Sequence, residues 1–276
     1  MNFCLPRIVG LVFVSLAAIV AQAQSYDEEL QRGVKAYKDT RFEQAMDHFR
    51  RATELDPGKS RAHLYLAAAL AGQYIPGVDS PDNVQYAEQA IEQFQHVLDS
   101  DADQTSRLNS VKGIAYLYLN RKKWDESKTY YQKASLLDPN DPENYYSIGV
   151  IDWTRSYELR RQGRALLGVK PEDPLSSWHP EQKKLCDELR AQNLSTVEEG
   201  IDSLNKAIQL RPDYDDAMAY MNLMYREKAD FECDTPSLRA QDLRTADEWV
   251  DKALAAKKHK GEKSNVVAPT TAPNPQ

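Results

Sequence analysis

The segment SKTYYQKASLLDP, residues 127–139, carries a spacing that recurs twice more in this chain of 276 residues. An aromatic or large apolar residue is followed three positions later by a small residue, and five positions after that by a proline. The three copies are Phe49, Ala52 and Pro57; Tyr131, Ala134 and Pro139; and Leu204, Ala207 and Pro212. Self-similarity at a fixed spacing predicts stacked supersecondary units, and it directs the search for function toward a binding surface.

The residues around these copies have the periodicity of helices. Leu30, Gly33 and Tyr37 share one helix face, and the apolar residues of segment 42–52 share another. Pro57 then ends the second helix, because proline cannot continue a helix and its predecessor avoids the helical region. Val, Ile and Thr form no alternating runs after Ser25, so we predict no strand.

This pairing of helices resembles the tetratricopeptide repeat family. In that family a small residue of the first helix meets a small residue of the second, and Gly33 and Ala45 match that pattern twelve residues apart. Ala115 and Ser127 repeat the same separation in the third and most regular unit. The resemblance covers roughly residues 26–256, and it implies an all-α, right-handed α-solenoid of about five helix pairs.

The other units are lengthened between their two helices. Their small pairs are Ala67 and Ala90, Gly149 and Gly200, and Asn222 and Ala246. The longest insertion, about residues 155–195, keeps helical composition on both sides of a proline-rich break. We therefore expect an overlong helical hairpin in the fourth unit, with an irregularity near Asn193, and extra material along one edge of the stack.

Residues 1–23 read as a signal peptide. Arg7 precedes an apolar stretch of 13 residues, Ile8 to Val20, and Ala21-Gln22-Ala23 is a small-x-small cleavage site. We predict cleavage after Ala23 and a periplasmic or secreted protein. The stretch is shorter than the roughly 20 residues that span a bilayer, so no stable membrane span is expected after cleavage. An uncleaved anchor remains the alternative.

The rest of the chain divides into a repeat domain and a tail. The repeat domain is predicted at residues 24–258, and residues 259–276, rich in Pro, Thr and Lys, are expected to be a disordered tail. The formal net charge of −7 argues against nucleic acid as a partner, because neutralising phosphates requires clustered Lys and Arg.

Two cysteines remain after the signal segment is removed. Cys186 and Cys233 lie at similar distances before and after the turn at Pro212, in the insertions of neighbouring repeats. Because both insertions are expected at the same edge, we predict a Cys186–Cys233 disulfide, which export would permit. Two buried free thiols are the alternative.

The family resemblance also implies where a ligand binds. In tetratricopeptide repeats the first helices line a concave groove that holds a peptide or protein segment. The corresponding residues here are Tyr37, Lys38, Lys112, Tyr116, Asn120, Tyr146, Val150, Trp153 and Arg226, with Val34, Leu64 and Ala68 beside them. Ordinary helix packing is the alternative for these side chains. Family members that clamp the C-terminal carboxylate of chaperones use a Lys and an Asn where this chain has Leu30 and Val34, so that clamp is not expected.

No pattern in the sequence calls for catalysis, a cofactor or a metal. The run Asp99–Asp103 resembles the start of a calcium loop, but Gln104 and Ser110 stand where the loop needs Gly and Glu. No two histidines are four residues apart, and phosphate-binding and nucleophile motifs are missing. We expect a protein that is not an enzyme.

The sequence thus predicts a non-catalytic scaffold of the bacterial cell envelope that binds a peptide or protein. Two alternatives stay open. One is an enzyme, or an accessory subunit, whose chemistry lies in the long insertion. Its candidate residues are Glu172, Asp173, His179 and Glu181. The other is a structural protein that assembles with copies of itself.

Overall fold

The computed structural model describes residues 25–170 and 173–266, and these residues form ten α-helices and no strand. The helices are α1 (Tyr26–Lys38), α2 (Phe42–Leu55), α3 (Ser60–Gln73), α4 (Pro81–Asp99), α5 (Gln104–Asn120), α6 (Trp124–Leu137), α7 (Pro142–Leu166), α8 (Pro180–Leu210), α9 (Asp215–Asp230) and α10 (Pro236–Val266). The predicted signal peptide, residues 1–23, lies outside the described residues, as do residues 267–276 of the predicted tail.

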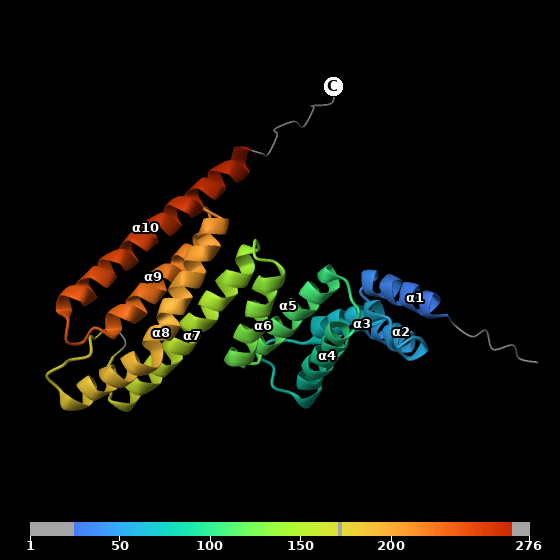
Figure 1. The fold of residues 1–276 in the computed structure, drawn as a ribbon, viewed down its shortest axis with the longest axis horizontal. Coiled ribbons are helices and arrows are strands. Elements are labelled where there is room, and N and C mark those ends of the chain that lie inside the picture. Colours follow the sequence, from blue (N-terminus) through green and yellow to red (C-terminus); the bar gives the residue numbers. More distant parts are fainter. Residues whose placement is uncertain (1–24, 171–172, 267–276) are drawn as a thin grey trace, which may run out of the picture.

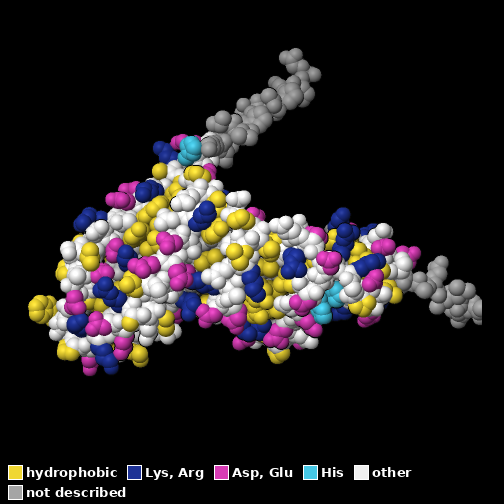
Figure 2. All heavy atoms as spheres, in the orientation of Figure 1, with side chains coloured by type: hydrophobic (Ala, Val, Ile, Leu, Met, Phe, Trp, Pro, Cys, Tyr) yellow, Lys and Arg dark blue, Asp and Glu magenta, His cyan; other side chains and the backbone are white. Residues whose placement is uncertain are grey.

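The helices form five antiparallel pairs that stack in chain order into an all-α solenoid, as predicted (Figure 1, and Figure 2 with all heavy atoms). Each helix packs against its neighbours in the chain, and the first helices of most successive pairs also touch: α1 with α3, α3 with α5, and α7 with α9. The connections within the second to fifth pairs lie along one edge of the molecule, the lower edge in Figure 1. Since three of these connections are lengthened, the extra material lies where we expected it.

Close contacts between helices explain the small residues. A Cβ added to Gly33 would lie 2.5 Å from Phe49 Cε1, so only glycine lets α1 approach α2 this closely. In the third pair the Ser127 hydroxyl donates to the Ala115 carbonyl at 2.9 Å. Both small pairs predicted from their twelve-residue separation therefore lie at helix–helix contacts.

The short turns between paired helices use a left-handed residue. Thr40 has φ 59° and Lys122 has φ 57°, each just after the first helix of its pair. In both turns the following amide donates back to a carbonyl five residues earlier, Arg41 to Ala36 and Lys123 to Tyr118. This arrangement satisfies carbonyls that the helix end would otherwise leave unpaired.

The overlong hairpin is confirmed: α7 has 25 residues and α8 has 31. The irregularity expected near Asn193 is absent, because α8 is continuous through that position and buries the Asn193 side chain. At the other end of the chain, α10 continues to Val266, past the domain boundary predicted at residue 258. Among the helices in the described ranges, none is long and apolar enough to cross a membrane.

Two apolar clusters stabilise the stack. One joins residues of α1 to α5. The other is formed mainly by α8 and α9 with the loop residue Leu175, and partly buried side chains of α7 pack against it. Between them lies α6, which buries only Ser127 and Ala134. The interior is therefore divided into two parts that meet around this helix.

Candidate binding groove

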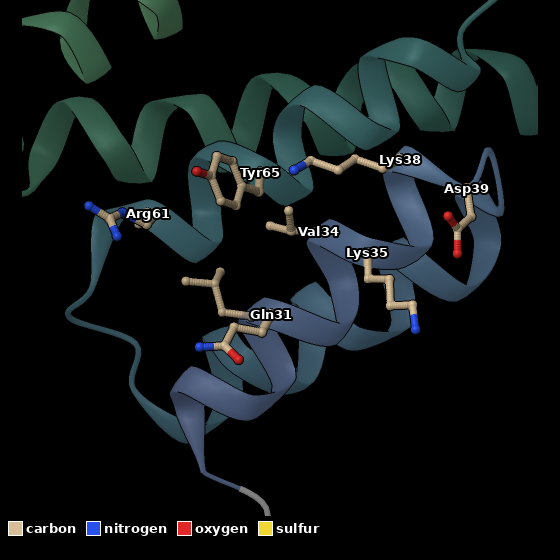
Figure 3. A pocket seen from close by; sticks show the side chains of 8 residues that line it. Gln31, Val34, Lys35, Lys38, Asp39, Arg61 and Tyr65 are labelled. Atoms are coloured by element: carbon tan, nitrogen blue, oxygen red, sulfur yellow. The ribbon is translucent and has the colours of Figure 1, made fainter.

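Two adjoining hollows lie between α1 and α3, the first helices of the first two pairs (Figure 3). Their volumes are about 450 and 310 Å³. The first is lined by Leu30, Gln31, Val34, Lys35, Lys38, Asp39, Arg61 and Tyr65, and the second by Val34, Tyr37, Lys38, Phe49, Tyr65 and Ala68. Because Val34, Lys38 and Tyr65 line both, the hollows form one continuous surface, which we call the N-terminal groove.

The helix geometry accounts for this surface. Val34 and Lys38 are one turn apart on α1, so both side chains point to the same side. Figure 3 shows Lys38 extending from α1 toward Tyr65 on α3, with Val34 between them. Ala68, one turn after Tyr65, leaves space because its side chain ends at Cβ.

The rim of the groove is basic. Lys35, Lys38 and Arg61 lie at the first hollow, and within the described residues none of these three forms an ion pair. The only carboxylate of this lining, Asp39, is paired with Arg41 at 2.7 Å. In a chain of net charge −7, the groove thus offers three cations above an apolar floor.

Further along the groove, the predicted cations are already neutralised. Lys112 forms an ion pair with Asp141, the N-cap residue of α7. Arg226 is paired with Asp247 at 2.7 Å and donates to Asn222 at 2.8 Å. Both cations already have a carboxylate partner within the fold, so they offer less to a ligand than the cations of the N-terminal groove do.

The remaining predicted residues of α5 lie near the surface. Tyr116 is 44% exposed. Asn120 donates its side-chain amide to the Tyr116 carbonyl at 2.8 Å and lines a different hollow, next to the turn that follows α5. The two therefore do not converge on the N-terminal groove.

The predicted residues of α7 form an aromatic cluster with α9. The Tyr146 ring lies 4.9 Å from Tyr214 and 5.7 Å from Tyr220. Trp153 stacks on Tyr157 at 5.1 Å and meets Tyr220 edge-on at 5.4 Å. Burial raises the pKa of the Tyr146 phenol well above its usual value. The Tyr146 and Trp153 side chains are half-buried, as is Val150, so here the first helices α7 and α9 pack on each other.

Comparisons with known proteins identify the repeat. A tetratricopeptide repeat family model matches residues 113–141, which span most of α5 and all of α6. The crystal structure of MamA protein superposes with a TM-score of 0.56 at 14% identity, over 90% of this chain and 98% of that one. Residues 113–141 thus match a tetratricopeptide repeat, and the described residues share the fold of the MamA structure.

Two further structures share the tetratricopeptide repeat fold. MamA from Desulfovibrio magneticus RS-1 has a TM-score of 0.53 at 14% identity, over 85% of this chain and 96% of that one. YrrB, described as a TPR protein with an unusual peptide-binding site, has a TM-score of 0.51 at 14% identity, over 84% and 91%. A comparison with curated proteins finds no match. At these identities the structural likeness shows the fold alone.

Sequence reasoning missed several residues of the N-terminal groove, among them Lys35, Arg61 and Tyr65. On α3 it selected Leu64, which is half-buried against the apolar cluster, and not Tyr65, which lines both hollows. Tyr65 lies three residues before Ala68, and Arg61 lies four residues before Tyr65. The helical period could therefore have placed Arg61 and Tyr65 on the same face of α3 as Ala68.

The long insertion has a small hollow of about 400 Å³ at its tip. Leu167, His179, Pro180, Glu181 and Gln182 line it. Of the residues named for the enzyme alternative, His179 and Glu181 line this hollow. The backbone carbonyl of Asp173 accepts a hydrogen bond from Arg164 at 2.6 Å. Glu172 lies outside the described residues. In the described part of the chain, no group of three or more His, Cys, Asp or Glu is arranged to hold a metal ion.

The structure brings the two cysteines together. The Cα atoms of Cys186 on α8 and Cys233 in the α9–α10 connection are 6.5 Å apart, and their sulfur atoms are within bonding distance. This Cα separation is within the range that disulfides span. Cys186 is 2% exposed.

Proposed function

We propose that this chain is a non-catalytic scaffold that binds a peptide or protein segment in its concave groove. The observation that carries the proposal is the N-terminal groove itself, an unfilled apolar floor between α1 and α3 with Lys35, Lys38 and Arg61 at its rim. Apolar burial would supply affinity, and the cations would select a segment that carries acidic groups. The peptide-binding site named for YrrB, a protein of the same fold, is in keeping with this function.

Site-specific photo-cross-linking in the intact cell tests the groove. A photo-reactive residue in place of Ala68, on the groove floor, should give a cross-linked partner, because Ala68 lies where the segment would bind. A residue in place of Leu136 on α6, 83% exposed and outside the groove, is the matched control. The Ala68 product should disappear when Lys38 is changed to Glu. Identical products from the two positions would contradict groove binding.

We further propose that the scaffold works in the bacterial envelope, after cleavage of residues 1–23. The small-x-small site before Gln24 supports cleavage, and the juxtaposed Cys186 and Cys233 support an oxidising compartment in which they form a disulfide. Intact mass of the protein from the periplasmic fraction is the test. A mass that begins at Gln24 and is two hydrogens below the reduced value is expected; a full-length, fully reduced chain in the cytosol would contradict both statements.

A further inference from the structure

A separate hollow lies on the connecting edge of the solenoid, outside the concave groove. It has a volume of about 490 Å³ and lies between the α3–α4 loop and the turn that follows α5. Its lining is Tyr74, Gly77, Val78, Asp79, Val84, Asn120, Arg121, Lys122 and Lys123. We call it the edge pocket. The lengthened loop of the second repeat therefore forms a wall against the next repeat along the lower edge in Figure 1.

The wall is held by one buried side chain. Asn83 is 5% exposed and lies at the start of α4. Its carbonyl oxygen accepts from the Ile75 amide at 2.7 Å, and its Nδ2 donates to the carbonyls of Ile75 and Val78 at 2.9 and 2.7 Å. These three bonds order the loop in the free protein, so a ligand would not have to order it on binding.

This ordered loop keeps two large apolar side chains in water. Ile75 is 59% exposed and Val78 is 44% exposed. Val78 also lines the pocket, beside Val84 and the buried Tyr74. A rigid loop that leaves aliphatic side chains in solvent next to a hollow has the character of a docking surface.

The opposite wall is basic. Arg121 is held in place by an ion pair with Glu88 at 2.9 Å. Lys122 and Lys123 are exposed and, within the residues that the structure describes, neither is paired with a carboxylate; the Lys123 ammonium lies 5.7 Å from the Tyr118 ring. Since Glu88 already pairs with Arg121, the two unpaired lysines face Asp79, the single carboxylate in the lining, in a chain of net charge −7. The pocket thus favours an anionic occupant.

We propose that the edge pocket docks a short acidic and aliphatic segment of a partner protein, independently of the concave groove. An aliphatic side chain of the segment packs against Val78 and Val84, and a flanking carboxylate lies between Lys122 and Lys123. A free phosphate would neutralise the two lysines but would leave the aliphatic side chains of the hollow exposed to water. A protein segment with both kinds of group covers the whole surface, and binding at one such short site is expected to be weak by itself.

Methyl NMR on the whole mature chain tests the proposal, with Ile75, Val78 and Val84 as reporters. The probe is the capped peptide acetyl-Gly-Glu-Leu-Glu-Gly-amide, titrated beside versions with Gln or Lys in place of both Glu residues. The Glu peptide should shift the three reporters with saturation, and the other two should bind at least about tenfold more weakly. Lys122→Glu combined with Lys123→Glu should abolish the shifts. Lys257→Glu with Lys258→Glu, which changes the charge equally on α10, should leave them intact.

Three results would overturn the proposal. One is equal binding of the Glu and Gln peptides, which would remove the role of charge. The second is shifts confined to groove methyls such as those of Val34 and Leu64. The third is an equal response of the three reporters to inorganic phosphate alone, which would assign the pocket to a small anion. Both lysines are exposed, so their substitution leaves the packed interior unchanged.

Discussion

Arg160 on α7 donates from Nε and Nη2 to both carboxylate oxygens of Glu227 on α9, at 2.8–3.0 Å, across 67 residues of chain. Glu227 is 2% exposed. A second arginine, Arg164, binds Asp230 at 3.0 Å and the carbonyls of Lys170 and Asp173 in the hairpin loop. This network attaches the projecting hairpin to the fifth helix pair.

Loss of one partner of the buried pair should be costly. Glu227→Ala should lower the free energy of unfolding by about 3–5 kcal/mol, because Arg160 stays in a site shielded from water without its main counter-ion. Glu158→Ala is the matched control, since it removes the exposed partner of Arg161 on the same helix, and it should cost less than about 1 kcal/mol. Urea unfolding measures both, and equal losses would contradict a structural role for the network.

Replacement of Gly149, in the fourth repeat, should lower the stability of the fold. A Cβ on Gly149 would lie 2.5 Å from Leu204 Cγ and 3.3 Å from the Gly200 carbonyl oxygen. Gly149→Ala should therefore lower the free energy of unfolding by about 1–3 kcal/mol, because the added methyl group pushes α7 away from α8. Gly261→Ala, in a helix position with nothing within 4 Å, should instead stabilise by up to about 1 kcal/mol. Melting curves that move in the same direction for both variants would refute this reading of the contact.

A buried carboxylate should make stability depend on pH. Burial raises the pKa of Asp152 from 3.8 to about 6, against the opposing effect of Lys128, whose ammonium lies 2.8 Å away. The folded state thus binds this proton more tightly than the unfolded state. The stabilisation is complete below pH about 4 and is lost as the pH rises through about 6.

Asp152→Asn removes this titration. The stability of the parent chain relative to the variant should fall by up to about 3 kcal/mol between pH 4 and pH 7, measured by urea unfolding at each pH. Asp103→Asn is the control of opposite sign, because hydrogen bonds from Ser106 hold the pKa of Asp103 below its usual value. A pH-independent difference for Asp152→Asn would show that the carboxylate is not buried as described.

The cysteine pair should stabilise the loop end of the hairpin, where α8 begins. A bond between Cys186 and Cys233 closes a loop with a sequence separation of 47 residues, for which the chain-entropy estimate is about 4 kcal/mol. Cys186→Ser and reduction of the parent chain should therefore give similar losses. Reduction should leave the variant unchanged. Two thiols that alkylate freely in the exported, non-reduced protein would exclude the bond.

The repeat architecture could be predicted because its determinants are local. Gly33 contacts Phe49 within one helix pair, and Ser127 binds Ala115 within another, so a fixed spacing in the sequence reports both contacts. The long hairpin could also be predicted, because segments of helical composition lie on both sides of the proline-rich break. The continuity of α8 could not be predicted from the sequence. Asn193 is buried by the packing of distant parts of the chain, which its sequence neighbours do not reveal.

The lining of the N-terminal groove could be predicted only in part. Tyr37 and Lys38 line the N-terminal groove, whereas Tyr146 and Trp153 pack on Tyr220. The family pattern gives the helix that faces the groove, but the spacing between successive first helices decides whether its aromatic side chains meet a ligand or each other. That spacing depends on packing across repeats, which a single sequence does not reveal.

The sparse interior of α6, with Ser127 and Ala134 as its buried residues, has a mechanical consequence. Larger apolar side chains fill the clusters on either side, so a change of packing at α6 displaces fewer buried side chains than a change inside a cluster. Beyond it extends α8, whose 31 residues make a lever of about 46 Å. A rotation of about 5° at α6 moves the far end of such a lever by about 4 Å. A small change of packing at α6 would therefore be amplified along α8 toward the tip of the hairpin.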